Sequence, residues 1–254
     1  MEILVGVDGS TESDSALAWA VAEARARGCG LAVVHCCESR YYGPWTTTRT
    51  LREGLRDLAR PIVADAVEQA TNLDPSVRVR GAVLVTEPTR ALVRLSAHAA
   101  LVVIGRPDRG ALSRLLLGSI TRHLLANAAC PVVAVRTDGG IDRVVAVITE
   151  PDTDEQTVAF AAAEAERHHV PVHVAVTSSA HGGSLAEAIT RVCAPTDLLV
   201  LGHHRHGRAP HRLGHDAVVA LHVATGPIAV VPEPRHADLP GTKVPVAAAC
   251  DVLG

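Results

Sequence analysis

The chain has 254 residues, of which 48% are hydrophobic and 2% aromatic, and its formal net charge is −3. This slightly acidic balance gives no reason to expect nucleic acid or an anionic membrane surface as a partner. No apolar run reaches the ~18–20 residues of a membrane span, and the chain begins directly with a strand pattern. We therefore expect a cytoplasmic protein with no membrane partner. Its six cysteines lack paired spacing, so we expect reduced thiols, with a redox role for Cys36 and Cys37 as the alternative.

The first part of the chain alternates between predicted strands and helices. A strand over Ile3–Val7 leads into a helix that Ser10 or a nearby Thr or Ser caps and that Gly28 or Gly30 ends. A second strand covers Leu31–Cys36. The further predicted elements are a helix over Leu51–Ala70, an edge strand over Val77–Val85, a helix over Thr89–Ala99, a strand over Leu101–Ile104, a helix from Gly118 and a strand over Val132–Val135. Five strands alternating with helices predict a doubly wound parallel α/β domain.

After a turn-rich linker the same pattern starts again. The predicted strands cover Arg143–Thr149, Val172–Thr177, Leu198–Gly202 and Ile228–Val231, and the predicted helices cover Asp154–His168, Ser184–Cys193 and Gly214–Ala224. The segment Phe160–Ala165 matches Trp19–Ala24, and the interval from Gly214 to Pro227 equals that from Gly118 to Pro131. These matches predict an internal repeat.

The repeat divides the chain into a first domain over 1–138, a reduced second domain over 141–232 and a C-terminal tail over 233–254. Few residues separate the second predicted strand of this domain from the helix over Ser184–Cys193, so the second helix and the edge strand of the first domain have no counterpart there. In the tail, Val244–Ala249 either adds a strand to an exposed sheet edge or remains loose.

The stretch Leu101–Val135 carries the strongest functional signal. A short apolar strand ends at Gly105, a loop rich in Arg and Gly follows, and Gly118 and Ser119 come directly before a helical pattern. The first turn of a helix has N–H groups without helical partners and a partial positive charge, and glycine allows close approach of a ligand. The sequence therefore predicts a phosphate site at the start of this helix.

The same stretch resembles the nucleotide loop of the universal stress protein family, whose pattern is G-x-x-G, nine residues, then G-[S/T]. Gly105 fills the first position, Gly118 and Ser119 fill the last pair, and Asp108 stands at the second glycine position. The opening VGVDGS also resembles this family. The resemblance implies two tandem doubly wound domains of strand order 3-2-1-4-5 with a degenerate second copy. It also implies that their last strands pair antiparallel, as an intrachain pseudo-dimer.

The resemblance further implies an adenine nucleotide site in the first domain, for ATP, ADP or AMP, with or without Mg²⁺. The residues that it assigns to this site are Val7, Asp8, Cys36, Gly105, Arg106, Asp108, Gly118, Ser119, Ile120 and Thr121. Pro107 removes one backbone donor from the loop, and the Asp108 carboxylate repels phosphate oxygens by roughly 1–4 kcal/mol at ~4 Å. We therefore expect AMP or ADP to be less penalised than ATP.

Three functions remain open. The first is a regulatory stress protein that binds a nucleotide and performs no fast chemistry; the second is an interaction scaffold of the same family that binds none. The third is a slow ATP-hydrolysing or adenylyl-transferring enzyme, although no nucleophile–base arrangement is visible. A second copy of the chain stays open as a partner. The histidines at positions 203, 204, 206, 211 and 215 are interpreted as a solvated loop rather than a metal site.

Overall fold

The computed structural model describes residues 1–38, 49–106, 118–136, 139–148, 155–176, 185–203 and 213–233. The first half contains β1 (Glu2–Gly6), α1 (Thr11–Arg27), β2 (Leu31–Cys37), α2 (Arg49–Leu73), β3 (Val79–Val85), α3 (Pro88–Ser96), β4 (Ala99–Gly105), α4 (Ser119–Asn127) and β5 (Val132–Val135). The second half contains β6 (Arg143–Ile148), α5 (Glu155–His168), β7 (Val172–Val176), α6 (Leu185–Val192), β8 (Asp197–His203), α7 (His215–Val223) and β9 (Ile228–Pro232).

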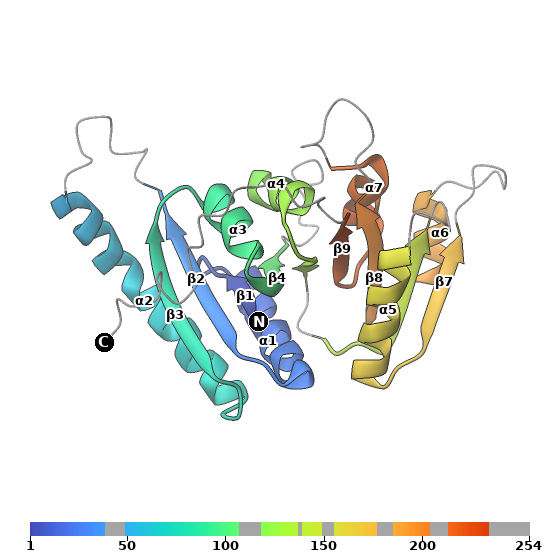
Figure 1. The fold of residues 1–254 in the computed structure, drawn as a ribbon, viewed down its shortest axis with the longest axis horizontal. Helices are drawn as coiled ribbons and strands as arrows, with labels where there is room; N and C mark the ends of the chain where they lie inside the picture. The colour runs from blue at the N-terminus through green and yellow to red at the C-terminus, as the bar shows by residue number, and fades with distance from the viewer. Residues whose placement is uncertain are drawn as a thin grey trace.

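The described strands form one nine-stranded sheet that runs through both halves, in the order β3-β2-β1-β4-β5-β9-β8-β6-β7. The two halves lie side by side in Figure 1, the first in blue to green and the second in yellow to red. The predicted doubly wound α/β fold is confirmed, and the first half has the expected order 3-2-1-4-5 with β3 at the sheet edge. In the second half, β9-β8-β6-β7 repeats the order of β5-β4-β1-β2, and β7 is the outermost described strand.

Most of the strands are buried because helices cover both faces of the sheet, whereas β7 at the edge keeps Val172, Val174 and Val176 exposed. On one face α1, α2 and α5 pack against it, and their contact residues are mainly alanine, such as Ala20, Ala66 and Ala161. On the other face α3, α4, α6 and α7 contribute leucine and isoleucine, among them Leu95, Leu124 and Ile189. This explains the near-continuous apolar composition of the strands, since a parallel sheet covered on both faces has no wet side.

The ends of α1 follow the sequence prediction, whereas the end of α3 does not. The Ser13 N–H donates to Ser10 Oγ at 3.2 Å, which caps α1, and Gly28 ends the helix with φ of 61°, a conformation that favours glycine. The predicted helix over Thr89–Ala99 was too long: α3 ends at Ser96, and β4 already starts at Ala99. At this end the Ser96 hydroxyl donates to the Val93 carbonyl and accepts from the Ala129 N–H at 2.8 Å, so the contact that holds it comes from a distant part of the chain.

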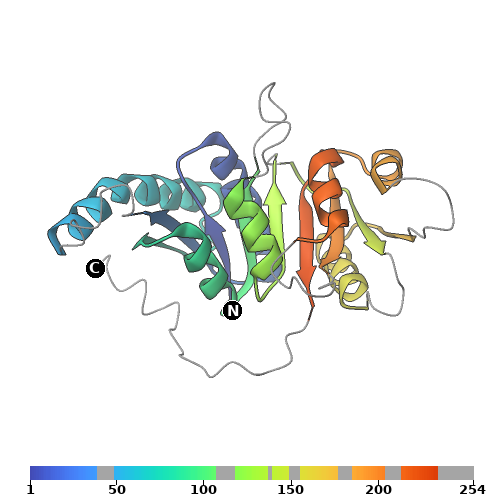
Figure 2. The ribbon, with the colours of Figure 1, turned by 90° about the horizontal axis from the view of Figure 1, so that it is seen from above.

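The two halves are joined through β5 and β9, which pair antiparallel, whereas the other strand pairs are parallel. Val132 lies opposite Val230, and Ala134 lies opposite Ile228. Figure 2 shows the two strands side by side at the centre of the molecule, running in opposite directions. The apolar pairs of this join are fully buried, so the core continues from one half into the other.

A buried group of charges also links the halves, where α1 packs against α5. Glu23 on α1 and Glu164 on α5 stand at matching positions of the similar segments Trp19–Ala24 and Phe160–Ala165, and each is 1% exposed. Arg27 donates hydrogen bonds to both carboxylates, and His168 Nε2–H donates to Glu23 Oε2 at 2.6 Å. Arg167 lies 2.7 Å from Glu164 Oε1. Each helix thus contributes a carboxylate and a donor that reach across to the other.

The two carboxyl groups of this cluster titrate in opposite directions. Burial raises the pKa of Glu23, but the His168 hydrogen bond and the Arg27 charge outweigh it and bring this pKa down to about 2. Burial and the nearby negative charge of Glu23 raise the pKa of Glu164 to about 7. Glu23, Glu164 and His168 lie close enough to share a metal ion. The two guanidinium groups already balance the carboxylates, however, so we interpret the cluster as an ion-pair network.

No helix of the described part of the chain is both long enough and apolar enough to cross a membrane. The predicted tail strand at Val244–Ala249 lies outside the described residues, as does most of the histidine-rich loop. His203, the first histidine of this run, is buried at the end of β8 rather than solvated, and His215 begins α7, so the interpretation as a solvated loop is wrong for His203.

Candidate functional site

A cavity of about 440 Å³ opens at the carboxyl ends of β1, β2 and β4. The amino ends of α1, α3 and α4 surround it, with Ser10 at the start of α1, Pro88 in α3 and Gly118 before α4. Since α1 and α3 cover opposite faces of the sheet, the cavity lies where the strand connections diverge. Ligands of open α/β sheets bind in such crevices, and the volume lies within the ~300–1,000 Å³ typical of small-molecule sites.

The structure brings most of the site residues predicted from the sequence together around this cavity. Those that line it are Val7, Asp8, Cys36, Gly105, Gly118, Ser119, Ile120 and Thr121. Asp108 lies outside the described residues, so its prediction stays a prediction. Arg106 is placed elsewhere: its side chain is 1% exposed and donates hydrogen bonds to carbonyl oxygens of the second half. Its guanidinium therefore does not face the cavity, in contrast to the expected phosphate contact.

The amino end of α4 differs from those of α1 and α3. The Ser10 side chain caps α1, and the Glu87 carboxylate accepts hydrogen bonds from the N–H groups of Thr89 and Arg90 at the start of α3. The residue before α4 is Gly118, which has no side chain to accept such bonds. The first helical hydrogen bond of α4 runs from the Arg122 N–H to the Gly118 carbonyl. The N–H groups of residues 119–121 come before this bond and therefore have no acceptor within the helix. This turn is suited to an anion.

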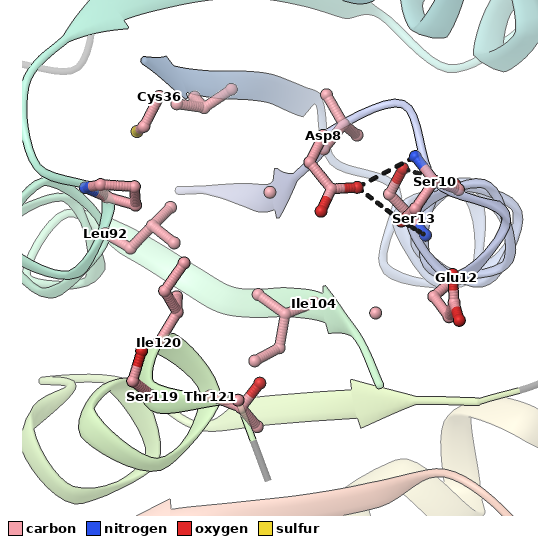
Figure 3. Close-up of a pocket in the computed structure, with 16 residues that line it drawn as sticks. Asp8, Ser10, Glu12, Ser13, Cys36, Leu92, Ile104, Ser119, Ile120 and Thr121 are labelled. Atoms are coloured by element: carbon pink, nitrogen blue, oxygen red, sulfur yellow. Dashed lines mark hydrogen bonds between the residues drawn. The ribbon is translucent and has the colours of Figure 1, made fainter. Parts of the chain in front are cut away.

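Hydroxyl groups add to this turn. Ser119 and Thr121 are both cavity residues, and Figure 3 shows their side chains on the same side of the cavity, below the end of β4. Thr121 is buried, while Ser119 and Ile120 are exposed. The turn therefore offers main-chain N–H donors and side-chain hydroxyls to one group, as phosphate binding requires.

Asp8 supplies a negative charge on another side of the cavity. One of its oxygens, Oδ1, accepts from the Ser10 N–H at 3.0 Å and from Ser10 Oγ at 2.5 Å, and Figure 3 shows the other oxygen turned toward the cavity. Partial burial raises the pKa of Asp8, but the two hydrogen bonds from Ser10 lower it more, and this pKa lies below its usual value. The carboxylate is thus ionised at neutral pH and can accept hydrogen bonds from hydroxyl or amino groups of a ligand.

The remaining wall is apolar. Val34 and Cys36 come from β2, Leu92 from α3 and Ile104 from β4. Burial raises the pKa of the Cys36 thiol to about 12, and the neighbouring Cys37 also has a raised pKa. Both thiols are therefore protonated at neutral pH, which argues against the redox-active pair considered from the sequence. Cys36 serves as an apolar wall that suits a flat ring.

Gly105 has a packing role in addition to the one expected. The sequence suggested that this glycine lets a ligand approach the backbone, but a Cβ here would lie 2.5 Å from the Glu12 carbonyl oxygen. The first turn of α1 therefore excludes any side chain at position 105, whether or not a ligand is bound. At Gly118, by contrast, the nearest atom to a Cβ would be Thr121 Oγ1 at 3.7 Å, an ordinary contact.

Replacing Gly105 with Ala is expected to lower the free energy of unfolding by about 1–3 kcal/mol, because β4 and α1 must move apart. Urea unfolding of the purified variant measures this loss. A suitable control is Gly54→Ala on the exposed face of α2, where a Cβ meets nothing within 4 Å and the helix should gain about 0.5–1 kcal/mol. Equal stabilities for Gly105→Ala and wild type would contradict the packing argument.

The sequence did not assign several cavity residues to the site. Ser10 was predicted only as a helix cap, and Ser13, Leu92 and Ile104 were not singled out as site residues. Leu92 and Ile104 sit in ordinary apolar patterns, and only their places at the carboxyl end of the sheet bring them to the cavity. Ser10 could have been found from its position directly after a strand that ends in an aspartate.

The fold and the cavity define a doubly wound α/β protein with a ligand-sized cavity at the carboxyl ends of its first sheet strands. The model of the Universal stress protein family matches residues 1–136, and the chain belongs to this family.

Universal stress proteins of mycobacteria are among the curated relatives that match. One from Mycobacterium tuberculosis strain H37Rv is 35% identical over 144 residues, which covers 55% of this chain and 49% of the relative. Another, from Mycolicibacterium smegmatis, is 35% identical over 145 residues, covering 54% of this chain and 48% of the relative. The match therefore spans about half the length of these relatives.

Among solved structures, a universal stress protein from Archaeoglobus fulgidus aligns with a TM-score of 0.73 and 14% identity. The alignment covers 91% of this chain and 98% of that chain, so the likeness of fold extends over both halves.

Proposed function

We propose that the first half of this universal stress protein binds an adenine nucleotide in the cavity, and that the protein acts as a regulatory stress-response protein rather than as a fast enzyme. The observation that carries the proposal is the arrangement of three unlike surfaces around one cavity. These are an apolar wall, the Asp8 carboxylate and the amino end of α4 without a side-chain cap. A nucleotide has three parts that match these surfaces in the same order: a flat base, a ribose with hydroxyl groups and a charged phosphate.

Each part of the nucleotide is assigned to one surface. The adenine ring lies against Val34, Cys36, Leu92 and Ile104, which offer it apolar contact. The ribose hydroxyls donate hydrogen bonds to the cavity-facing oxygen of Asp8, which is ionised. The phosphate accepts hydrogen bonds from the N–H groups at the start of α4 and from its hydroxyls. The exposed apolar side chain of Ile120 gains a contact when the cavity fills.

The number of phosphates and the role of Mg²⁺ follow from the charges near α4. Within the described part of the cavity, the side chains beside this turn are hydroxyls, and the acidic Asp8 lies across from them (Figure 3). Hydroxyls suffice for one phosphate, whereas a triphosphate carries more charge, and the family pattern assigns Asp108 to the phosphate loop. We therefore propose the order AMP or ADP before ATP, with Mg²⁺ as a companion of the longer phosphate chains only.

We further propose that residues 141–232 are a reduced copy of the same domain and form an intrachain pseudo-dimer with residues 1–138. The strand order of the second half and the antiparallel β5–β9 join support this assignment. So does the reciprocal placing of Glu23 and Glu164, because in a two-fold arrangement equivalent residues meet across the axis. The second half would then support the first without a nucleotide site of its own.

Titration of the purified chain with AMP, ADP and ATP, each with and without Mg²⁺, tests the proposed function. Binding is measured by calorimetry and by the shift in melting temperature, with GMP as the control for the base. We expect saturable binding of at least one adenine nucleotide and a melting temperature that rises with its concentration. Binding of none of them would instead support the interaction scaffold. Conversion of ATP during long incubation, measured by chromatography, would support the enzyme.

A further inference from the structure

Arg106 connects the cavity to the second half of the chain. It is the first residue after β4 and directly follows Gly105, a cavity residue. Its main-chain N–H donates to the Val135 carbonyl oxygen at 2.7 Å, which extends the pairing of β4 with β5. Its side chain is 1% exposed, so the guanidinium is enclosed by protein. Arg106 is therefore held at the point where the cavity wall ends and the junction between the halves begins.

The guanidinium of Arg106 donates to three main-chain carbonyl groups of the second half. Nη1 donates to Leu221 O at 2.7 Å, and Nη2 donates to Ala224 O at 3.1 Å and to Gly226 O at 2.8 Å. These carbonyls lie in the last turn of α7 and directly after it. Carbonyl groups at the end of a helix have no helical partner and carry a partial negative charge, which favours a cation. The planar fork of arginine satisfies several of them at once.

The turn that accepts these bonds is itself tightly fixed. A Cβ at Gly226 would lie 2.5 Å from Asp197 O and 2.6 Å from Pro195 O, so this turn packs closely against the start of β8. Arg136, which follows β5, also donates to Ala224 O, at 3.2 Å. Two arginines at the carboxyl ends of neighbouring strands thus bind the same turn, but Arg106 alone of the two adjoins a residue that lines the cavity.

We infer that Arg106 is a positioning residue for the nucleotide site: by binding the end of α7 it fixes the carboxyl end of β4, and the second half thereby supports ligand binding in the first. This inference rests on the proposed function. Ile104 and Gly105 form part of the cavity wall, so a displacement of the end of β4 changes the shape of the cavity. The α7 turn acts on the ligand without contacting it.

The test compares Arg106→Ala and Arg106→Lys with the control Arg136→Ala. Both arginines donate a hydrogen bond to Ala224 O, so both alanine variants weaken the junction between the halves. Only the Arg106 variant also frees the neighbouring cavity residue, Gly105. We measure the dissociation constant of the adenine nucleotide that wild type binds, well below each melting temperature. Arg106→Ala should bind on the order of tenfold more weakly, within the range usual for coupling between separate sites, and Arg136→Ala should bind within about twofold of wild type. Arg106→Lys should lie between wild type and Arg106→Ala.

A second measurement does not depend on the ligand. Amide hydrogen exchange of residues 101–106 in the unliganded protein should become faster in Arg106→Ala than in Arg136→Ala. If Arg106→Ala does not fold, Arg106→Lys carries the comparison, since it keeps the buried charge but loses the fork. Equal nucleotide affinities for wild type and the Arg106 variants would overturn the inference and leave the proposed function standing. Equal losses for Arg106→Ala and Arg136→Ala would also overturn it, and absence of binding by wild type would overturn both.

Discussion

Replacing Gly118 with Asp is expected to abolish most of the phosphate-dependent binding while leaving the protein fully folded. The backbone at Gly118 is extended, with φ of −51° and ψ of 139°, and a Cβ there meets Thr121 Oγ1 at 3.7 Å, so the new side chain fits. Aspartate is a preferred N-cap residue, because its carboxylate accepts hydrogen bonds from the first turn of the helix. The variant thus supplies α4 with an intramolecular acceptor in place of the phosphate.

The loss of affinity has two sources. The new carboxylate occupies the N–H groups that the phosphate would use, and it repels the phosphate by roughly 1–4 kcal/mol at ~4 Å. This corresponds to a loss of about fivefold to about a thousandfold in the affinity for AMP or ADP. Adenosine has no phosphate and should bind with almost unchanged affinity. Calorimetric titration with AMP, ADP and adenosine measures the difference, and the melting temperature should stay the same or rise slightly.

The chain offers a matched control in Gly214, which precedes α7 as Gly118 precedes α4. Its backbone is also extended, with φ of −57° and ψ of 154°, and a Cβ at this position meets nothing within 4 Å. Gly214→Asp should therefore cap its helix equally well without any effect on the nucleotide. If Gly118→Asp weakened adenosine as much as AMP, or if Gly214→Asp had the same effect, the phosphate would not bind at α4.

Replacing Glu164 with Gln is expected to remove a pH dependence of stability that the α1–α5 cluster causes. The pKa of Glu164 is raised to about 7, so between about pH 4.5 and pH 7 the folded chain holds a proton that the unfolded chain releases. Such a group contributes its stabilisation at low pH and loses it as the pH rises through its folded value. Wild type should thus lose stability relative to Glu164→Gln between pH 5 and pH 8, by roughly 1–3 kcal/mol.

The glutamine replaces the protonated carboxyl with a group of the same shape. Its oxygen can accept from Arg27 and Arg167, and its amide group can donate to Glu23, so the cluster keeps its bonds at every pH. Urea unfolding of both proteins from pH 5 to pH 8 gives the difference in the free energy of unfolding. The control is Glu166→Gln, an exposed position on the same helix, which should follow the wild-type profile. A difference between wild type and Glu164→Gln that does not vary with pH would refute the prediction.

The sequence predicted the local features of the fold well, because their causes are local. The cap at Ser10 and the end of α1 at Gly28 follow from residues within one turn of the helix. The apolar strands could be recognised from their composition, while their order came from the family resemblance. The extent of α2 was underestimated, since the prediction of Leu51–Ala70 became Arg49–Leu73. Helix ends are set by weak interactions, and no strong cap marked these two.

The candidate site was predictable where it depends on position along the chain, and not where distant segments meet. The residues around α4 and Asp8 could be placed together because they follow strands whose carboxyl ends share one edge. The role of Arg106 could not be predicted in this way, since its hydrogen-bond acceptors lie 115 to 120 residues further along the chain. The same applies to Gly105, whose steric neighbour is the carbonyl of Glu12. The sequence therefore assigned the Arg106 side chain to the ligand, although it contacts the second half, and it did not reveal that Gly105, which lines the cavity, also packs against α1.

Because β5 and β9 belong to one polypeptide, the association of the two halves does not depend on the concentration of the protein. A contact between two separate chains dissolves on dilution, whereas one within a single polypeptide keeps the same effective concentration at every protein level. The halves therefore stay associated in a cell that makes very few copies. A signal that loosens them acts chemically, for example through the loss of the proton from Glu164 as the pH rises, and scarcity of the protein alone has no such effect.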